Sequence, residues 1–66
     1  MNIMKVVSKL NVAGRTILTL DGDILGLNAS KVIVDGKEYD YDIAYDFPNT
    51  IGVKVSDVVS DVVEFI

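Results

Sequence analysis

The sequence contains no cysteine and no histidine. This absence excludes disulfides, zinc sites built from thiolates, cysteine nucleophiles and imidazole bases. Small secreted domains usually depend on disulfides, so the lack of cysteine favours a cytoplasmic location. Nothing in the composition predicts a metal or another cofactor.

Long hydrophobic runs, proline and glycine are also scarce. No run approaches the roughly 20 apolar residues of a membrane span, and charged residues interrupt the first ten positions before a signal-peptide core can form. We therefore expect neither a membrane segment nor a signal peptide. One proline and five glycines in 66 residues, half of them apolar, predict a folded chain. This length allows one domain, residues 1–66, of modest stability that self-association would support.

Basic residues are scarce in the second half of the chain. Residues 1–33 carry four basic and two acidic side chains, a balance of +2, whereas residues 34–66 carry two lysines and eight acids, a balance of −6. Binding of nucleic acid through its phosphates is therefore not expected. We interpret the acidic side chains as a solvated sheet face.

The most informative stretch is residues 31–47, KVIVDGKEYDYDIAYDF. Asp35-Gly36 is a dipeptide that favours a type I′ turn, which predicts a tight hairpin. A two-residue loop there sets the register, pairing Val34 with Lys37, Val32 with Tyr39, and Lys31 with Asp40. A register shifted by one residue would move the apolar side chains to the acidic face, so we reject it.

After the turn, polar and apolar residues alternate with the period of a strand. One face carries Tyr39, Tyr41, Ile43, Tyr45 and Phe47, and the other carries Glu38, Asp40, Asp42, Ala44 and Asp46. The favoured interpretation places all the aromatic rings in the core. The alternative is that the strand bends near Ala44, which would bring Tyr45 and Phe47 to the surface beside Pro48. We expect a bend or break there because eleven residues exceed the usual strand length.

The other segments also read as strands joined by turns. Residues 3–12 form a strand with Met4, Val6, Ser8, Leu10 and Val12 facing inward, and a loop at Ala13-Gly14 leads to a second strand at residues 15–21, with Thr16, Leu18 and Leu20 inward. A short strand with a bulge at Gly26 is expected at residues 24–27, and another strand at residues 51–55. Residues 55–66 have helical spacing, yet their valines favour a helical turn at residues 56–59 and a closing strand at residues 61–66.

These elements predict an all-β fold, a small five- to six-stranded barrel that is SH3-like or OB-like, with at most one short helical turn near the C-terminus. Residues 43–47, Ile-Ala-Tyr-Asp-Phe, resemble the Ala-Leu-Tyr-Asp-Phe/Tyr motif in the first strand of SH3 domains, which bind proline-rich peptides through aromatic residues. The resemblance covers five residues; in SH3 domains the motif lies near the N-terminus, whereas here nineteen residues follow it.

No constellation of residues predicts catalysis. Asp21-Gly22-Asp23 and the row Glu38, Asp40 and Asp42 do not match a calcium loop, and so small a domain offers little cleft in which to shift a carboxyl pKa. We therefore expect a non-catalytic protein–protein interaction module, a homo-oligomer by self-association. The candidate binding residues are Tyr45, Phe47, Pro48, Asp42 and Asp46, and those for self-association are Ile3, Val7 and Ile17. The alternative is an acidic inhibitor or nucleic-acid mimic that acts through the acidic row.

Overall fold

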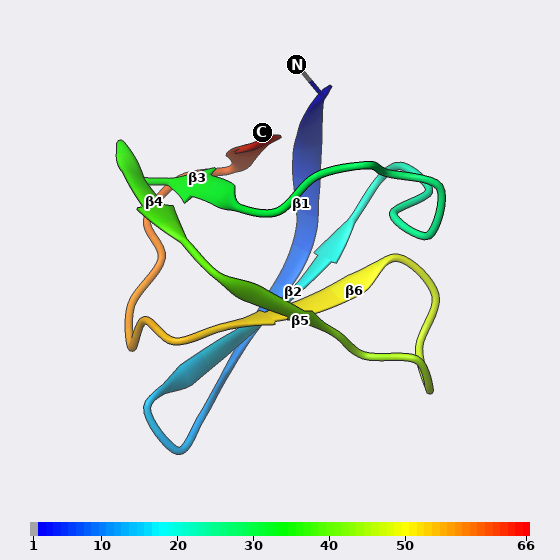
Figure 1. The fold of residues 1–66 in the computed structure, drawn as a ribbon. Helices are drawn as coiled ribbons and strands as arrows, with labels where there is room; N and C mark the ends of the chain where they lie inside the picture. Colours follow the sequence, from blue (N-terminus) through cyan, green and yellow to red (C-terminus); the bar gives the residue numbers. More distant parts are fainter. Residues whose placement is uncertain (1) are drawn as a thin grey trace.

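The computed structural model describes residues 2–66 and confirms the all-β prediction (Figure 1). The strands are β1 (Asn2–Val12), β2 (Arg15–Leu20), β3 (Val32–Val34), β4 (Lys37–Tyr39), β5 (Tyr41–Ile43), β6 (Thr50–Val53) and β7 (Val62–Phe65). All their pairings are antiparallel. No helix among these residues is long and apolar enough to cross a membrane.

The strands follow one another in the order β4-β3-β7-β1-β2-β6-β5. The two outermost strands, β4 and β5, are consecutive in the chain and only Asp40 separates them. The sheet therefore curls into a nearly closed barrel (Figure 1). Counting β4 and β5 as one bent strand gives six, so the break at Asp40 accounts for the difference from the expected five or six.

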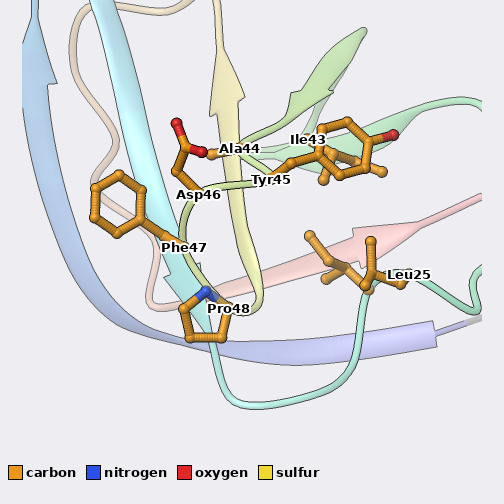
Figure 2. Close-up of a pocket in the computed structure, with 8 residues that line it drawn as sticks. Leu25, Ile43, Ala44, Tyr45, Asp46, Phe47 and Pro48 are labelled. Atoms are coloured by element: carbon orange, nitrogen blue, oxygen red, sulfur yellow. The ribbon is translucent and has the colours of Figure 1, made fainter.

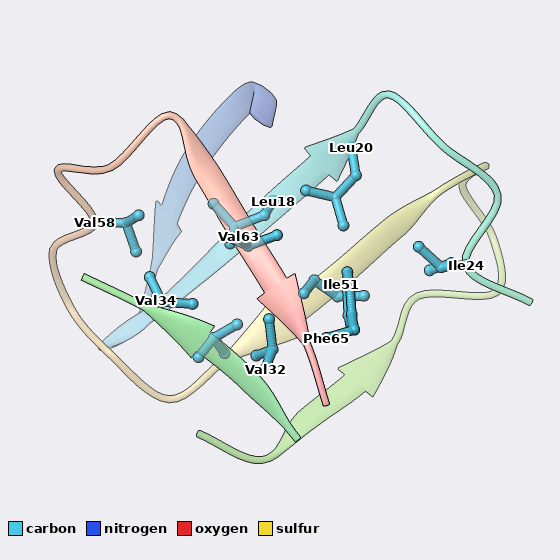
Figure 3. Packing of buried hydrophobic residues seen from close by; sticks show 10 residues of the cluster. Leu18, Leu20, Ile24, Val32, Val34, Ile51, Val58, Val63 and Phe65 are labelled. Atoms are coloured by element: carbon cyan, nitrogen blue, oxygen red, sulfur yellow. The ribbon is translucent and has the colours of Figure 1, made fainter. Parts of the chain in front are cut away.

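The interior of the barrel holds one apolar core, drawn in Figure 3. The rings of Tyr41 and Phe65 meet edge to face, with centroids 5.2 Å apart and an angle of 79° between their planes. The Tyr41 hydroxyl donates to the carbonyl of Ala29 at 3.1 Å, so its polar end is satisfied at the rim. The buried apolar side chains are Leu18, Leu20, Ile24, Val32, Val34, Ile51, Val53, Val58, Val63 and Phe65.

The hairpin of β3 and β4 forms as the Asp-Gly dipeptide predicted. Asp35 and Gly36 have φ angles of 51° and 80°, and Val34 pairs with Lys37 while Val32 pairs with Tyr39. Lys31 and Asp40 form an ion pair of 2.8 Å at the open end. The predicted register is confirmed at the two pairs within the strands, and the ion pair fits the predicted placement of Lys31 opposite Asp40.

A β-bulge in β1 overturns part of its predicted facing. The pairing with β2 shifts between Val6 and Ser8, which makes Val7 an extra residue and reverses the two faces beyond it. Met4 and Val6 face the core as expected. Leu10 and Val12 point outward instead, with 62% and 48% of their surface exposed, and Ser8 lies with them because it pairs with Thr19 on that side. The inward placement predicted for Ser8, Leu10 and Val12 is wrong.

The strand expected at residues 24–27 is also wrong, because turn hydrogen bonds replace it. The Asp23 carboxylate accepts from the backbone N–H of Leu25 at 3.0 Å, and the N–H of Leu27 bonds to the carbonyl of Ile24 at 3.3 Å. Ile24 is buried whereas Leu25 is exposed. Gly26 has no positive φ and lies in a turn, so no bulge forms there.

The C-terminal segment closes the barrel with a strand, as favoured, but lacks the helical turn expected at residues 56–59. The Asp35 carboxylate accepts from the backbone N–H groups of Val59 and Ser60 at 3.0 and 2.7 Å. These bonds hold the segment extended against the β3–β4 turn. Val58 is buried in the core, and β7 follows at Val62–Phe65.

Candidate protein-binding surface

The loop of residues 44–49 turns the chain sharply after β5. The backbone N–H of Ala44 donates to the carbonyl of Thr50 at 2.9 Å, and the N–H of Phe47 donates to the carbonyl of Ala44 at 3.1 Å. The break predicted near Ala44 is therefore confirmed. Tyr45 and Phe47 lie beyond it with 80% and 65% of their surface exposed, so the expectation that all rings enter the core is wrong for these two.

The far end of this loop is fixed to β2. Asn49 has a φ of 54°, and its carbonyl accepts from the N–H of Leu20 at 2.8 Å. The Thr50 hydroxyl lies 2.9 Å from the carbonyl of Pro48 and 3.3 Å from the hydroxyl of Thr19. The loop is thus anchored at both ends, and it presents two aromatic side chains to solvent from a fixed backbone.

A first hollow of about 280 Å³ lies on one side of the loop (Figure 2). Tyr45 lies beside Ile43 on one wall and Leu25 lies across from them, with Pro48 at the end. The 23–25 turn is what brings Leu25 to the surface, where it is 68% exposed.

A second hollow of about 210 Å³ lies on the other side, and Phe47, which points away from Tyr45 in Figure 2, lines both. Leu10 and Ile17 form its apolar floor, since they pair across β1 and β2 on the outward face. Leu10 reaches this face only because of the bulge at Val7. We call the exposed apolar area around both hollows the Phe47 surface; it consists of Leu10, Ile17, Leu25, Tyr45 and Phe47.

The neighbour of Ile17 in β6 is Gly52, which has no side chain, so no side chain of β6 rises beside Ile17 on the outward face. A Cβ atom at Gly52 would come within 3.4 Å of Ile17 Cδ1. Beyond it, Asp42 pairs with Gly52 and its carboxylate accepts from Arg15 at 2.5 Å. A neutral ion pair therefore borders the apolar area.

The structure brings together only some of the residues proposed from sequence. Tyr45, Asp46, Phe47 and Pro48 share the loop at residues 44–49, and Asp42 lies on the same sheet face as Ile17. Ile3 and Val7 are exposed at 66% and 67%. However, Ile3 lies opposite Glu64 on β7, whereas Ile17 lies opposite Leu10 on the hairpin.

Sequence reasoning missed Leu10 and Leu25. The alternation of the first strand predicts Leu10 in the core, and the apolar segment at residues 24–27 predicts Leu25 in a strand. The only signal for Leu10 was Val7, which departs from the alternation of β1 and marks the bulge. The signal for Leu25 was Asp23, which can accept from a backbone N–H two residues later.

The acidic row is largely neutralised by cations of the same chain. Asp40 pairs with Lys31 and Asp42 with Arg15, while Glu38 is exposed on β4. The hydrogen bond from the Lys31 ammonium, and then its charge, lower the pKa of the Asp40 carboxyl below 3.8, and the same contact raises the pKa of Lys31 above 10.5. Within residues 2–66, no three acidic side chains gather where they could hold a metal ion.

Comparison with known proteins does not indicate a function for this chain. Comparisons with known protein families, with characterised proteins and with solved structures find no match. Function is therefore inferred from this chain's own surface.

Proposed function

We propose that the chain is a non-catalytic protein–protein interaction module that binds a second copy of itself through the Phe47 surface. The observation that carries this proposal is the exposure of Tyr45 and Phe47 on an anchored loop between two apolar hollows. Clustered exposed aromatic and aliphatic side chains of this kind are typical of protein interfaces. Exposure of the Ile43–Phe47 motif also fits a binding role, as in the SH3 domains it resembles.

Charge favours a second copy as the occupant. Two chains of net charge −4 repel each other, and in each chain eight of the ten acidic residues lie in residues 34–66. Residues 2–20, which form β1 and β2, contain three basic residues and no acid. Lys9 and Arg15 are paired with Asp61 and Asp42, which neutralises two of these three basic residues. Contact on the β1–β2 side of the Phe47 surface therefore involves the part of the chain with the fewest free acids, and Asp46 is the one acidic residue that lines the two hollows.

The other functions have weaker support. Two of the three carboxylates in the acidic row have intramolecular partners, so the row offers less free negative charge to a basic site than its sequence suggests. The lining of the two hollows includes a single carboxyl group, Asp46, and this does not provide an acid–base pair. The lack of cysteine fits a cytoplasmic module.

Light scattering of the full chain at increasing concentration in moderate salt tests self-binding. The expected molar mass rises from 7.2 kDa toward twice that value. Phe47→Asp is expected to shift the equilibrium to the monomer, because it places an unpaired charge in an apolar contact. A mass of 7.2 kDa at every concentration contradicts the proposal and leaves binding of a different protein.

Ile3→Asp is the matched control. Ile3 is as exposed as Phe47, at 66% against 65%, but lies outside the Phe47 surface. This variant should dimerise like the parent. Val7→Asp, next to Ser8 at the second hollow, should weaken the dimer while leaving the monomer folded. Equal weakening by Ile3→Asp and Phe47→Asp would point to a general charge effect and reject the Phe47 surface.

A further inference from the structure

The second half of β1 has a strand on one side only. β7 pairs with Asn2 to Lys5, and the last backbone bond on that side runs from the N–H of Val6 to the carbonyl of Asp61 at 2.8 Å. Beyond this point Asp35 draws residues 59–60 toward the β3–β4 turn. Every residue from 7 to 14 is exposed, and the hairpin turn extends away from the rest of the barrel in Figure 1.

The turn geometry shows which backbone groups face this open edge. Ala13 and Gly14 form a two-residue loop with φ angles of 50° and 80°, so the flanking pair, Val12 and Arg15, exchanges both hydrogen bonds. From this pair onward, hydrogen-bonded and non-hydrogen-bonded pairs alternate along the hairpin. The Lys9–Leu18 and Asn11–Thr16 pairs are therefore not bonded to each other, and the backbone groups of Lys9 and Asn11 point away from β2.

An independent bond supports this assignment. The N–H of Leu20 donates toward β6, to Asn49, which means that the even-numbered residues of β2 direct their backbone groups away from β1. Leu18 and Thr16, the neighbours of Lys9 and Asn11, share that parity. Outside the β1–β2 ladder and within the residues described, the backbone N–H and C=O groups of Lys9 and Asn11 make no hydrogen bond.

We propose that this edge pairs antiparallel with the same edge of a second copy, with Leu10 opposite the partner subunit's Leu10. This inference rests on the proposed self-association and places one residue of the Phe47 surface, Leu10, at the contact between the two β1 strands. The N–H of Lys9 would donate to the carbonyl of the partner subunit's Asn11, and the N–H of Asn11 to that of the partner subunit's Lys9. The two-fold axis doubles these bonds to four, which satisfies the outward backbone groups of Lys9 and Asn11 in both copies.

The side chains fit this register. The partner subunit's Val12 comes to lie opposite Ser8, at the rim of the second hollow, and the two Leu10 side chains meet on the outward face. Lys9 lies opposite an asparagine, and its ammonium is held by the carbonyl of Val59 at 3.2 Å and by Asp61 at 3.3 Å. Neither like-charge repulsion nor a projecting lysine therefore blocks the edge.

The protections common on exposed edge strands are missing where the edge is open. Natural edges are often blocked by proline, by a lysine pointing into the approach, or by a bulge within the exposed stretch. Here β1 contains no proline, Lys9 is tied to its own chain, and the bulge at Val7 lies before Lys9, where the proposed hydrogen bonds begin. A three-residue edge buries less than the roughly 800 Å² per partner of a standard interface, so the dimer should be weak and transient.

Asn11→Pro and Asn11→Ala form a matched pair that tests the edge. Both remove the 2.9 Å bond between the Asn11 side chain and the Thr16 hydroxyl, but only proline removes the outward N–H. The intramolecular ladder survives in both, since that N–H does not bond to β2. Asn11→Pro should raise the dimer dissociation constant by roughly tenfold or more, because two hydrogen bonds are lost per dimer. Asn11→Ala should dimerise like the parent.

Amide hydrogen exchange of the parent provides a second measurement that does not depend on the folding of the proline variant. The amides of Lys9 and Asn11 should exchange rapidly in dilute solution, and about tenfold or more slowly once the dimer forms. A dimer whose Lys9 and Asn11 amides stay unprotected, or one that Asn11→Pro leaves intact, overturns edge pairing while self-association stands. A mass of 7.2 kDa at all concentrations overturns both.

Discussion

The two hairpins of the barrel have the same turn and opposite surroundings. Ala13-Gly14 has φ angles of 50° and 80°, and Asp35-Gly36 has φ angles of 51° and 80°. Each turn joins strands in two-residue register. Yet β3 lies between β4 and β7 with Val32 and Val34 buried, whereas β1 is exposed from residue 7 to its end. Turn chemistry thus sets the register of both hairpins, and the neighbouring segments decide that β3 is covered while the second half of β1 is not.

The difference arises from contacts made by the second hairpin alone. Asp35 bonds to the N–H groups of Val59 and Ser60, which attaches the C-terminal segment to that turn. Lys31 and Asp40 close its other end at 2.8 Å. In the first hairpin, Lys9 and Arg15 pair with residues outside it instead. The turn of the second hairpin is therefore attached to the C-terminal segment, and the turn of the first extends from the barrel.

The largest expected effect tests the equivalence of the two turns. Gly36→Val and Gly14→Val should each lower the free energy of unfolding by about 3 kcal/mol, the upper end of the cost of a non-glycine residue at positive φ. No atom lies within 4 Å of a Cβ built at either glycine, so the cost comes from backbone strain alone. Urea unfolding measures it. If either variant is as stable as the parent, the two turns are not equivalent.

A smaller effect should separate the residues that precede the two turns. Val34→Ala removes two buried methyl groups and should cost about 2 kcal/mol, whereas Val12→Ala, at a position that is 48% exposed, should change stability by less than about 0.5 kcal/mol. The same urea experiment compares them. Similar costs at the two positions would show that the first hairpin is packed in solution more tightly than the monomer structure shows.

The smallest effect concerns the ion pair of the second hairpin. The pKa of Asp40 should lie below 3.8 by NMR titration, because the carboxylate accepts a hydrogen bond from Lys31 and sits beside its charge. A carboxyl pKa lowered by folding adds stability above its unfolded value, and this contribution is lost as the pH falls through the folded pKa. In Lys31→Ala the Asp40 pKa should return toward 3.8. An unchanged pKa in that variant would exclude Lys31 as the cause.

Much of the fold was predictable where one local signal acts alone. Asp35-Gly36 determined its turn type and register, and the alternation of Thr16, Leu18 and Leu20 identified the inward face of β2. The closing strand followed from valines that fit a sheet better than a helix. Each of these predictions depends on residues that are close in sequence.

The errors occurred where contacts distant in sequence decided the outcome. A side chain of the second hairpin, Asp35, prevents the helical turn at residues 56–59, and no pattern within that segment could reveal it. The Phe47 surface combines residues from four segments: β1, β2, the 23–25 turn and the loop at residues 44–49. Three of its five residues, Ile17, Tyr45 and Phe47, were among the candidates from sequence, but Leu10 and Leu25 required the bulge and the 23–25 turn.

The one extra residue at the Val7 bulge changes which side chains of β1 face the core. Up to Val6 the even-numbered residues of β1 face the core. Beyond Ser8 the odd-numbered residues lie on that side, so the two halves of the strand have opposite facing. Removal of this one residue would restore a single alternation, turning Leu10 and Val12 inward and Lys9 and Asn11 outward. The number of residues in β1 thus determines that Leu10 and Val12 lie on the outer surface of the hairpin.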